Sequence, residues 1–351
     1  MSRAPAENLF PSYPAAWYLF GRSRDLLDKP VSKQMLGQRL VAYRTTNGKA
    51  AIIDAACSHQ GADLGRGRVV GDCLQCPFHQ WEFSPDGRCV RIPTQSSIPP
   101  FAHQSAYPVV ERHGFIFLFN GETPLFPLPF FLNQDPQDFL PGRLFSFVAD
   151  CSWFLLTGNG FDTAHFQTVH DRQLVSDPIV DCPAPYARRM HFVTRVTGQS
   201  LADRFIRTVI GDVVEVTITN WGGPVVVVTG KFGGVTSYML IMTRALEPNK
   251  TFVEVIVFAP LAKNSLIRRM VQPCVLEVRR WLTRAFLNDD RQRLPGIRYN
   301  PRTMIHADRE LIHFLQWLVA LPQSAKDLAR SEEPNLESQN QPFSLSEGSL
   351  P

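Results

Sequence analysis

Two cysteine–histidine pairs lie close together in the first quarter of the chain. The first is Cys57-x-His59, and the second, after sixteen intervening residues, is Cys76-x-x-His79. Two thiolates and two imidazoles in this order are metal ligands, and a segment that brings four ligands together must fold around the centre they hold. The pairs therefore constrain this region more tightly than secondary-structure propensity does.

Three kinds of centre compete for these ligands. A Rieske [2Fe–2S] cluster takes two cysteines on one iron and two histidines on the other, and its neutral imidazoles raise the reduction potential. A structural zinc ion would take Cys57, Cys73, Cys76 and His79, but it leaves His59 without a role. A redox C-x-x-C at Cys73 and Cys76 normally opens a helix, whereas the residues that follow here are strand-like. The pattern favours the Rieske cluster.

The residues around the two pairs indicate β structure. Residues 39–44 and 51–54 are predicted strands, and the Asn47-Gly48 pair between them is a strong hairpin signal. A further buried strand is predicted at 115–119. We therefore expect the ligands on loops at the tip of a small antiparallel β domain, where histidine edges reach solvent or a partner.

A second candidate site lies further along, at Asp162-x-x-His165-x4-His170. Two histidines with a nearby carboxylate are typical of a mononuclear iron site with two His ligands and one carboxylate. On an ideal helix, positions i and i+5 lie roughly 140° apart. A π-bulge or a helix break is therefore needed to bring the rings together. The alternative, an amphipathic helix with two unrelated histidines, is less favoured downstream of the cluster motif.

The carboxylate ligand is expected from Asp289 or Asp290, which follow a predicted helix over 265–287. Adjacent helical residues point about 100° apart, so only one of the two can be a ligand. Asp290 lies four residues before apolar Leu294, on the inward face, and is the predicted ligand. The alternative is that both are solvated charges at a helix end.

The second half of the chain is predicted to be a twisted antiparallel sheet with helices packed on it, which makes the whole protein α+β. We expect a β domain over 15–125, a catalytic domain over 126–322 and a disordered, Ser- and Glu-rich tail over 323–351. The predicted strands of the sheet are 145–156, 213–221, 224–230, 237–245 and 252–259, and the predicted helices are 265–287 and 307–321.

Composition excludes several classes of function. A net charge of +4, from 36 basic and 32 acidic residues, is too small to indicate nucleic-acid binding. Seven cysteines without a tight framework fit a reducing compartment, and residues 1–7 lack an apolar leader, so we expect a cytoplasmic protein. The apolar run 225–242, which Lys231 and several glycines interrupt, is predicted to be two strands and not a membrane span.

The two motifs together resemble the oxygenase component of the Rieske non-haem iron oxygenases. The resemblance covers residues 15–322 and rests on the four cluster ligands, on Asn159-x-x-Asp162-x-x-His165-x4-His170, and on a late aspartate. The nearest similarity is to the aminopyrrolnitrin oxygenase-like group, and more broadly to the vanillate demethylase and ketosteroid hydroxylase branches. The resemblance implies a Rieske domain followed by a helix-grip catalytic domain, with substrate between sheet and helices.

The resemblance also implies roles for individual residues. Asn159 and Asp162 would be catalytic, with Asp162 linking the cluster of one subunit to the iron of its neighbour in a head-to-tail homotrimer. Phe161 and Phe286, as neighbours of the proposed ligands, are the first candidates for pocket walls. The cluster ligands would be Cys57, His59, Cys76 and His79, and the ligands of the catalytic Fe(II), which keeps positions open for O2, would be His165, His170 and Asp290.

The expected function is that of a terminal oxygenase acting on a hydrophobic small molecule. The outcome would be hydroxylation, demethylation, desaturation or N-oxidation. No reductase motif is fused to the chain, so electrons from NAD(P)H would arrive through a separate ferredoxin or flavin reductase. Two alternatives stay open: a Rieske electron carrier without the second iron, and a zinc-stabilised binding module.

Overall fold

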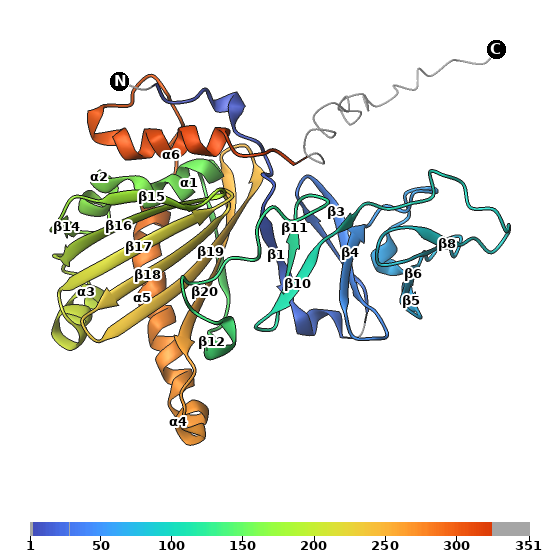
Figure 1. Cartoon of the computed structure of the whole chain (residues 1–351), viewed down its shortest axis with the longest axis horizontal. Coiled ribbons are helices and arrows are strands. Elements are labelled where there is room, and N and C mark those ends of the chain that lie inside the picture. Colours follow the sequence, from blue (N-terminus) through green and yellow to red (C-terminus); the bar gives the residue numbers. More distant parts are fainter. Residues whose placement is uncertain (1–2, 28, 325–351) are drawn as a thin grey trace, which may run out of the picture.

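A computed structural model of the chain describes residues 3–27 and 29–324 and has an α+β fold, as predicted (Figure 1). A group of small antiparallel sheets formed by the N-terminal third lies beside one large sheet with helices packed on it. The predicted disordered tail falls almost entirely on residues 325–351, which lie outside the described residues.

The N-terminal part contains three small sheets. Their strand orders are β1-β11-β10, β2-β3-β4-β9 and β5-β6-β7-β8. The predicted hairpin is confirmed as β3 and β4, with Gly48 at φ 83° in the turn. The strands are β1 (Trp17–Arg22), β2 (Val31–Met35), β3 (Gln38–Arg44), β4 (Ala50–Asp54), β5 (Arg68–Val70), β6 (Cys73–Gln75), β7 (Glu82–Phe83), β8 (Cys89–Arg91), β9 (Ala106–Tyr107), β10 (Val109–Arg112) and β11 (Phe115–Phe119).

The large sheet has nine antiparallel strands. Its central order is β12-β20-β19-β18-β17-β16-β14, with β13 paired to β20 and β15 to β16. The apolar run 225–242 forms β18 and the first part of β19, as predicted. The strands are β12 (Phe139–Pro141), β13 (Phe145–Ala149), β14 (Arg172–Leu174), β15 (Ile179–Ala184), β16 (Ala187–Val196), β17 (Val213–Trp221), β18 (Val225–Phe232), β19 (Val235–Glu247) and β20 (Lys250–Pro260).

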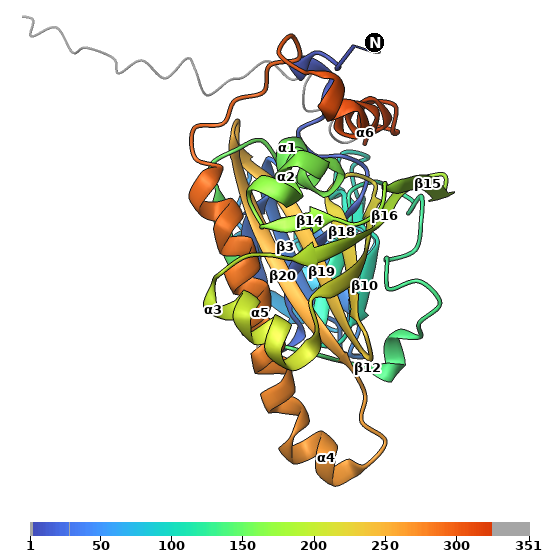
Figure 2. The ribbon, with the colours of Figure 1, turned by 90° about the vertical axis from the view of Figure 1, so that its left-hand side faces the viewer.

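The helices lie on one face of this sheet, except for α4, which extends past its edge (Figure 2). They are α1 (Trp153–Gly158), α2 (Thr163–Thr168), α3 (Leu201–Phe205) with the π-helical turn η6 (Ile206–Ile210), α4 (Ser265–Met270), α5 (Gln272–Arg293) and α6 (Arg309–Val319). Within the described part of the chain, no helix combines the length and apolarity that crossing a membrane would require.

Two predicted elements differ from the structure. The strand predicted over 145–156 ends at Ala149, and its second half is helix α1, because a short unbroken apolar run fits a buried helix as well as a strand. The predicted helix 265–287 is two helices. Pro273 lacks the N–H that would continue the hydrogen bonds of α4, so α5 begins separately and then runs on to Arg293.

Strand alternation gives the large sheet two different faces. Leu240 and Met242 of β19 pack into the core shared with the N-terminal strands, against residues such as Trp17. Their neighbours Met239 and Ile241 point to the other face, towards the helices, and line a cavity there. Helix α5 crosses that face. The residues near its C-terminal end can therefore contact the short helices α1 and α2.

Candidate metal centres and substrate cavity

The two loops that carry the cysteine–histidine pairs have matching backbones. In each, the cysteine N–H donates to the carbonyl five residues later, over 2.9 Å at Cys57 and 2.8 Å at Cys76. The fourth residue after each cysteine has a positive φ, 74° at Gly61 and 58° at Gln80, which lets the loop turn back on itself. Two tight loops of the same shape therefore present the four ligands.

Like ligands lie beside like ligands. The thiols of Cys57 and Cys76 are buried and contact each other, and the rings of His59 and His79 have centroids 4.6 Å apart. This pairing matches the Rieske arrangement, with both sulfurs on one iron and both imidazoles on the other. Burial, with a smaller contribution from the neighbouring Cys76 thiol, raises the pKa of Cys57 to about 11, so binding of a metal would have to displace the proton.

The site fits the cluster in a second respect. The Nδ1 atom of His59 is buried and has no hydrogen-bond partner among the described residues, as expected for a nitrogen that binds iron. The Trp81 ring stacks on His59 at a centroid distance of 4.5 Å and fixes the ring. The zinc alternative is less well supported, because among the described residues Cys57, Cys73, Cys76 and His79 do not come together as a group that could hold one metal ion.

A helix break brings His165 and His170 together. Asp162 caps α2, its carboxylate accepting from the His165 N–H at 3.0 Å, and the helix ends at Thr168. Asp171, which lies between this helix and β14, has φ 51°, so the chain turns sharply just after His170. As a result the two Nε2 atoms lie 3.1 Å apart despite the i, i+5 spacing.

Asp290 of α5 completes the group. Its Oδ1 lies 2.9 Å from His165 Nε2 and its Oδ2 lies 3.4 Å from His170 Nε2. Burial alone would raise the Asp290 pKa, but hydrogen bonds from the two imidazoles outweigh it and hold the pKa at about 2. Burial instead raises the pKa of Asp289. The structure thus brings Asp290, and not Asp289, between the two histidines, as an anionic ligand candidate.

The two candidate catalytic residues lie beside this group. The Asn159 side-chain amide donates to Asp290 Oδ1 over 3.2 Å and so orients the carboxylate. Asp162 is half-buried, and among the described residues nothing forms a hydrogen bond with its second carboxylate oxygen. That oxygen is available to a further donor.

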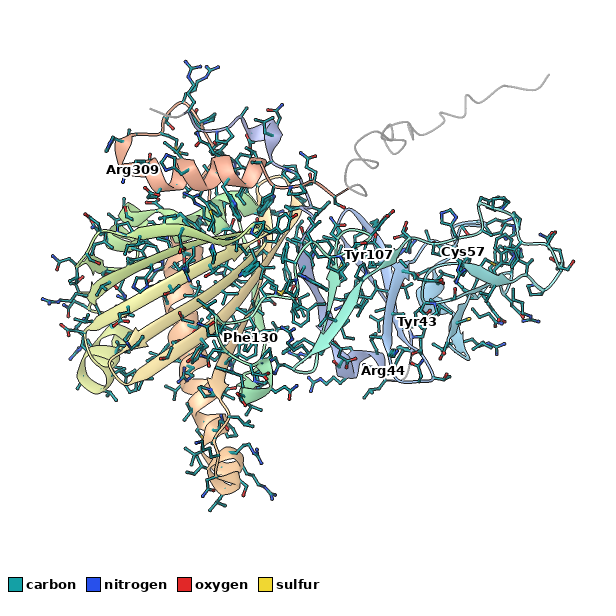
Figure 3. All side chains as sticks on the ribbon, in the orientation of Figure 1. Tyr43, Arg44, Cys57, Tyr107, Phe130 and Arg309 are labelled. Atoms are coloured by element: carbon teal, nitrogen blue, oxygen red, sulfur yellow. The ribbon has the colours of Figure 1, made fainter. Side chains whose placement is uncertain are left out.

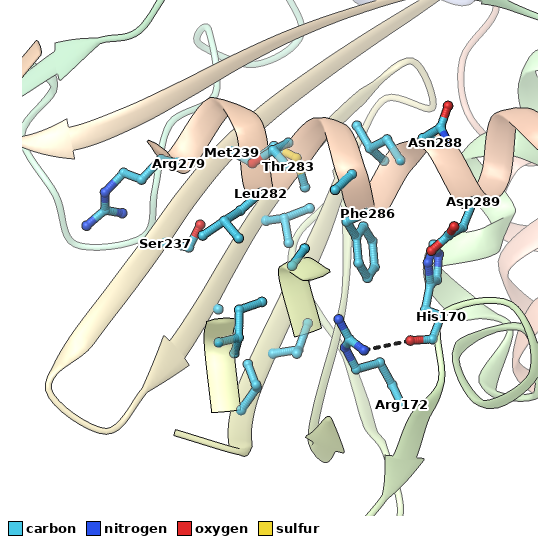
Figure 4. A pocket seen from close by; sticks show the side chains of 18 of the residues that line it. His170, Arg172, Ser237, Met239, Arg279, Leu282, Thr283, Phe286, Asn288 and Asp289 are labelled. Atoms are coloured by element: carbon cyan, nitrogen blue, oxygen red, sulfur yellow. Dashed lines mark hydrogen bonds between the residues drawn. The ribbon is translucent and has the colours of Figure 1, made fainter. Parts of the chain in front are cut away.

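A cavity of about 830 Å³ extends from the histidines along α5 (Figure 4). Its walls are mostly aliphatic and aromatic. Phe286 stacks on the His170 ring at 3.8 Å and lines the cavity, as predicted. The prediction for Phe161 is wrong: this ring is fully buried and stacks on Phe314 at 4.3 Å, because sequence proximity to a ligand does not fix the direction of a side chain.

Sequence reasoning missed one polar feature of the cavity. Arg172 pairs with Asp203 at 2.7 Å and also donates to the His170 carbonyl at 2.7 Å, so it holds the strand that follows the second histidine (Figure 4). Both charges are largely buried. The available signal was the position of Arg172, only two residues after His170 in the sequence.

Comparison with known proteins agrees with this geometry. Residues 16–102 match the Rieske [2Fe-2S] domain family. Aminopyrrolnitrin oxygenase PrnD of Pseudomonas fluorescens is 35% identical over 166 residues, which are 44% of this chain and 46% of that protein. The oxygenase component of 3-ketosteroid-9-alpha-monooxygenase from Rhodococcus rhodochrous is 36% identical over 116 residues, 32% of this chain and 30% of that protein. The match thus spans less than half the length of these relatives.

The fold is shared with a solved oxygenase over almost the whole chain. Dicamba monooxygenase bound to 3,6-dichlorosalicylic acid superposes with a TM-score of 0.65 at 20% sequence identity. The match covers 91% of this chain and 99% of the other. The likeness therefore extends through both the N-terminal sheets and the nine-stranded sheet.

Proposed function

We propose that this chain, which carries a Rieske [2Fe-2S] domain and is homologous to oxygenase components of Rieske systems, is itself a terminal oxygenase. The observation that carries the proposal is the group of His165, His170 and Asp290 at one end of a large apolar cavity. An electron carrier would need neither the second group nor the cavity. A single site that joins three metal ligands to a substrate-sized space favours oxidation of a bound molecule.

The proposal assigns the two ligand groups to two iron centres. When bound, the cluster would supply single electrons at a raised potential, and the mononuclear iron would supply the chemistry of oxygen activation. Asn159 would keep the Asp290 carboxylate oriented, and Phe286 would hold the His170 ring by stacking. The cluster ligands would be Cys57, His59, Cys76 and His79.

Electron supply to the iron is proposed to cross a subunit boundary. Cys57 lies on the far side of the N-terminal strands from the nine-stranded sheet (Figure 3), and α2 lies on the opposite side of the molecule (Figure 1). A neighbouring copy in a head-to-tail trimer would bring its own cluster to α2. The unused oxygen of Asp162 would then accept from a cluster histidine of that neighbour and orient its ring.

The cavity supports a hydrophobic substrate. A volume of about 830 Å³ lies in the upper part of the range for ligand sites, and an apolar lining favours a molecule with few polar groups. The relatives named above include a ketosteroid monooxygenase and an aminopyrrolnitrin oxygenase. The substrate class is therefore an extended hydrophobic small molecule, oxidised at the end that reaches His165 and His170.

The remaining components are proposed to be separate proteins. A ferredoxin or a flavin reductase would deliver electrons from NAD(P)H to the cluster. A cytoplasmic location is part of the proposal and is supported by cysteine usage. None of the seven cysteines, all of which lie in the described part of the chain, forms a disulfide, which fits a reducing compartment.

The test is substrate-triggered oxygen uptake. Purified chain, supplied with electrons by a surrogate reductase, is screened with hydrophobic candidates for O2 consumption matched by product formation. Asp162→Asn should keep both metal centres and their spectra but lose coupled turnover. A chain that holds only the two cluster irons, and that shows no O2 uptake with any candidate, would favour the electron-carrier alternative. Unchanged turnover in Asp162→Asn would remove the bridge role.

A further inference from the structure

Helix α4 projects beyond the body of the molecule and carries uncovered apolar side chains. Both views show α4 extending past the edge of the nine-stranded sheet (Figures 1 and 2). Leu266 and Met270 are 68% and 64% exposed, and Ile267 and Val271 are about half exposed. Solitary exposed apolar residues are ordinary, but four within six residues on a projecting helix form a patch that calls for a partner.

This patch is continuous with the mouth of the cavity. Several residues of α5, α3 and η6 both line the cavity and remain exposed, so they mark its opening. The residues with both properties are Leu201, Phe205, Val209, Val275, Val278 and Trp281. The opening therefore has an apolar rim, and an apolar surface leads from it along α5 to the tip at α4.

The charged residues near this end of the molecule are all basic. The segment from Leu261 to Leu276 contains Lys263, Arg268 and Arg269 and no acidic residue. All three cations are exposed, and none forms an ion pair with a described residue. Exposed apolar side chains beside unpaired Lys and Arg are the pattern of helices that lie in the headgroup region of anionic membranes.

We propose that the α4 tip, defined as residues 263–271, docks on an anionic lipid surface and turns the cavity mouth towards it. The apolar residues of the tip would enter the boundary between headgroups and acyl chains, and Lys263, Arg268 and Arg269 would contact lipid phosphates. A hydrophobic substrate could then pass from the lipid along the apolar rim without crossing water. The docking itself is independent of the metal centres, whereas the passage of substrate rests on the proposed function.

The test is binding of the full chain to lipid vesicles. Vesicles of phosphatidylcholine alone are compared with vesicles that also contain phosphatidylserine, by co-sedimentation at low and high salt. We expect binding to the serine-containing vesicles, weakened by salt, and a loss of about tenfold or more in Ile267→Glu/Met270→Glu. The matched control is Ile179→Glu on β15, a 66% exposed position away from the tip, which should bind as the unchanged chain does.

A second readout locates the contact. The two exposed cysteines, Cys274 beside the tip and Cys182 on β15, are labelled singly with a polarity-sensitive dye, each in a variant that lacks the other. Vesicles should shift the emission of the Cys274 dye and leave that of the Cys182 dye unchanged.

Equal binding of the double variant and its control would overturn the proposal. So would a failure to bind either vesicle, or a fall in oligomeric state in the double variant, which would mark the tip as an interface between copies. Binding needs no turnover, so its failure is distinct from failure of the oxygenase proposal.

Discussion

The side-chain amide of Asn159 donates a hydrogen bond of 3.2 Å to Asp290, 131 residues later in the chain. It joins the end of α1 to the last turns of α5 and sets the direction of the carboxylate between the two histidines. A partner of this kind orients a metal ligand, and its loss typically lowers metal affinity or activity 10–100-fold.

Asn159→Ala is therefore expected to lower the affinity of the mononuclear site for iron by roughly 10–100-fold while leaving the cluster spectrum unchanged. Competition with a chelator measures the first effect and visible absorbance the second. Asn288→Ala is the control, because Asn288 also lines the cavity but is exposed and is not bonded to Asp290. Equal effects of the two substitutions would contradict the orienting role.

Trp81 supports the cluster loops through its stacking on His59 and through its burial, since it is 6% exposed. Trp81→Ala should lower the free energy of unfolding of the N-terminal part by about 3–5 kcal/mol, because it empties a large buried volume. Trp81→Phe keeps an aromatic face on the imidazole and should cost far less. Denaturation followed by the loss of cluster absorbance compares them, and a similar midpoint for both variants would show that the stacking matters little.

Glu254, which lies between the N-terminal sheets and the nine-stranded sheet, has a shifted pKa. Burial raises the pKa of Glu254 to about 7, although the charges of Arg244 and Lys33 oppose the rise. The folded chain then holds this proton more tightly than the unfolded chain does. Its contribution to stability is complete below pH 4.5 and is lost as the pH rises through 7, by at most about 3 kcal/mol.

Glu254→Gln should therefore flatten the dependence of the thermal midpoint on pH between about 5 and 8 and raise the midpoint most at the upper end of that range. Glu247→Gln, at an exposed acid on the same antiparallel strand pair, should leave the pH profile unchanged. A profile that stays as steep in Glu254→Gln as in the unchanged chain would show that another group titrates.

The sequence was most informative where chemistry restricts residue choice. Spacing alone predicts Cys57 and His79 as candidate ligands. The inward face of α5 favours Asp290 over Asp289, and in the structure Asp290 lies beside the two histidines. The i, i+5 spacing required a break or a bulge, and the structure has a break at the end of α2. These inferences rest on local geometry that a single segment determines.

The rest depended on tertiary context. Strands β14, β15 and β16 were not predicted, because they are short or rich in arginine and half-exposed, which weakens the alternation of apolar residues. The apolar run that begins at Trp153 fits a strand as well as a helix by its sequence, and its packing decides for helix α1. The Phe161 error has the same cause, because the ring packs against Phe314, a residue far away in the sequence.

The central claim, that one chain holds both a Rieske cluster and a separate catalytic iron, is tested most directly by the iron and acid-labile sulfide content of the purified, fully loaded protein. Two cluster irons and one further iron at His165, His170 and Asp290 predict three irons and two sulfides per chain. A content of two irons and two sulfides per chain, with no further iron bound when Fe(II) is added in excess, would contradict this claim. It would indicate an electron carrier.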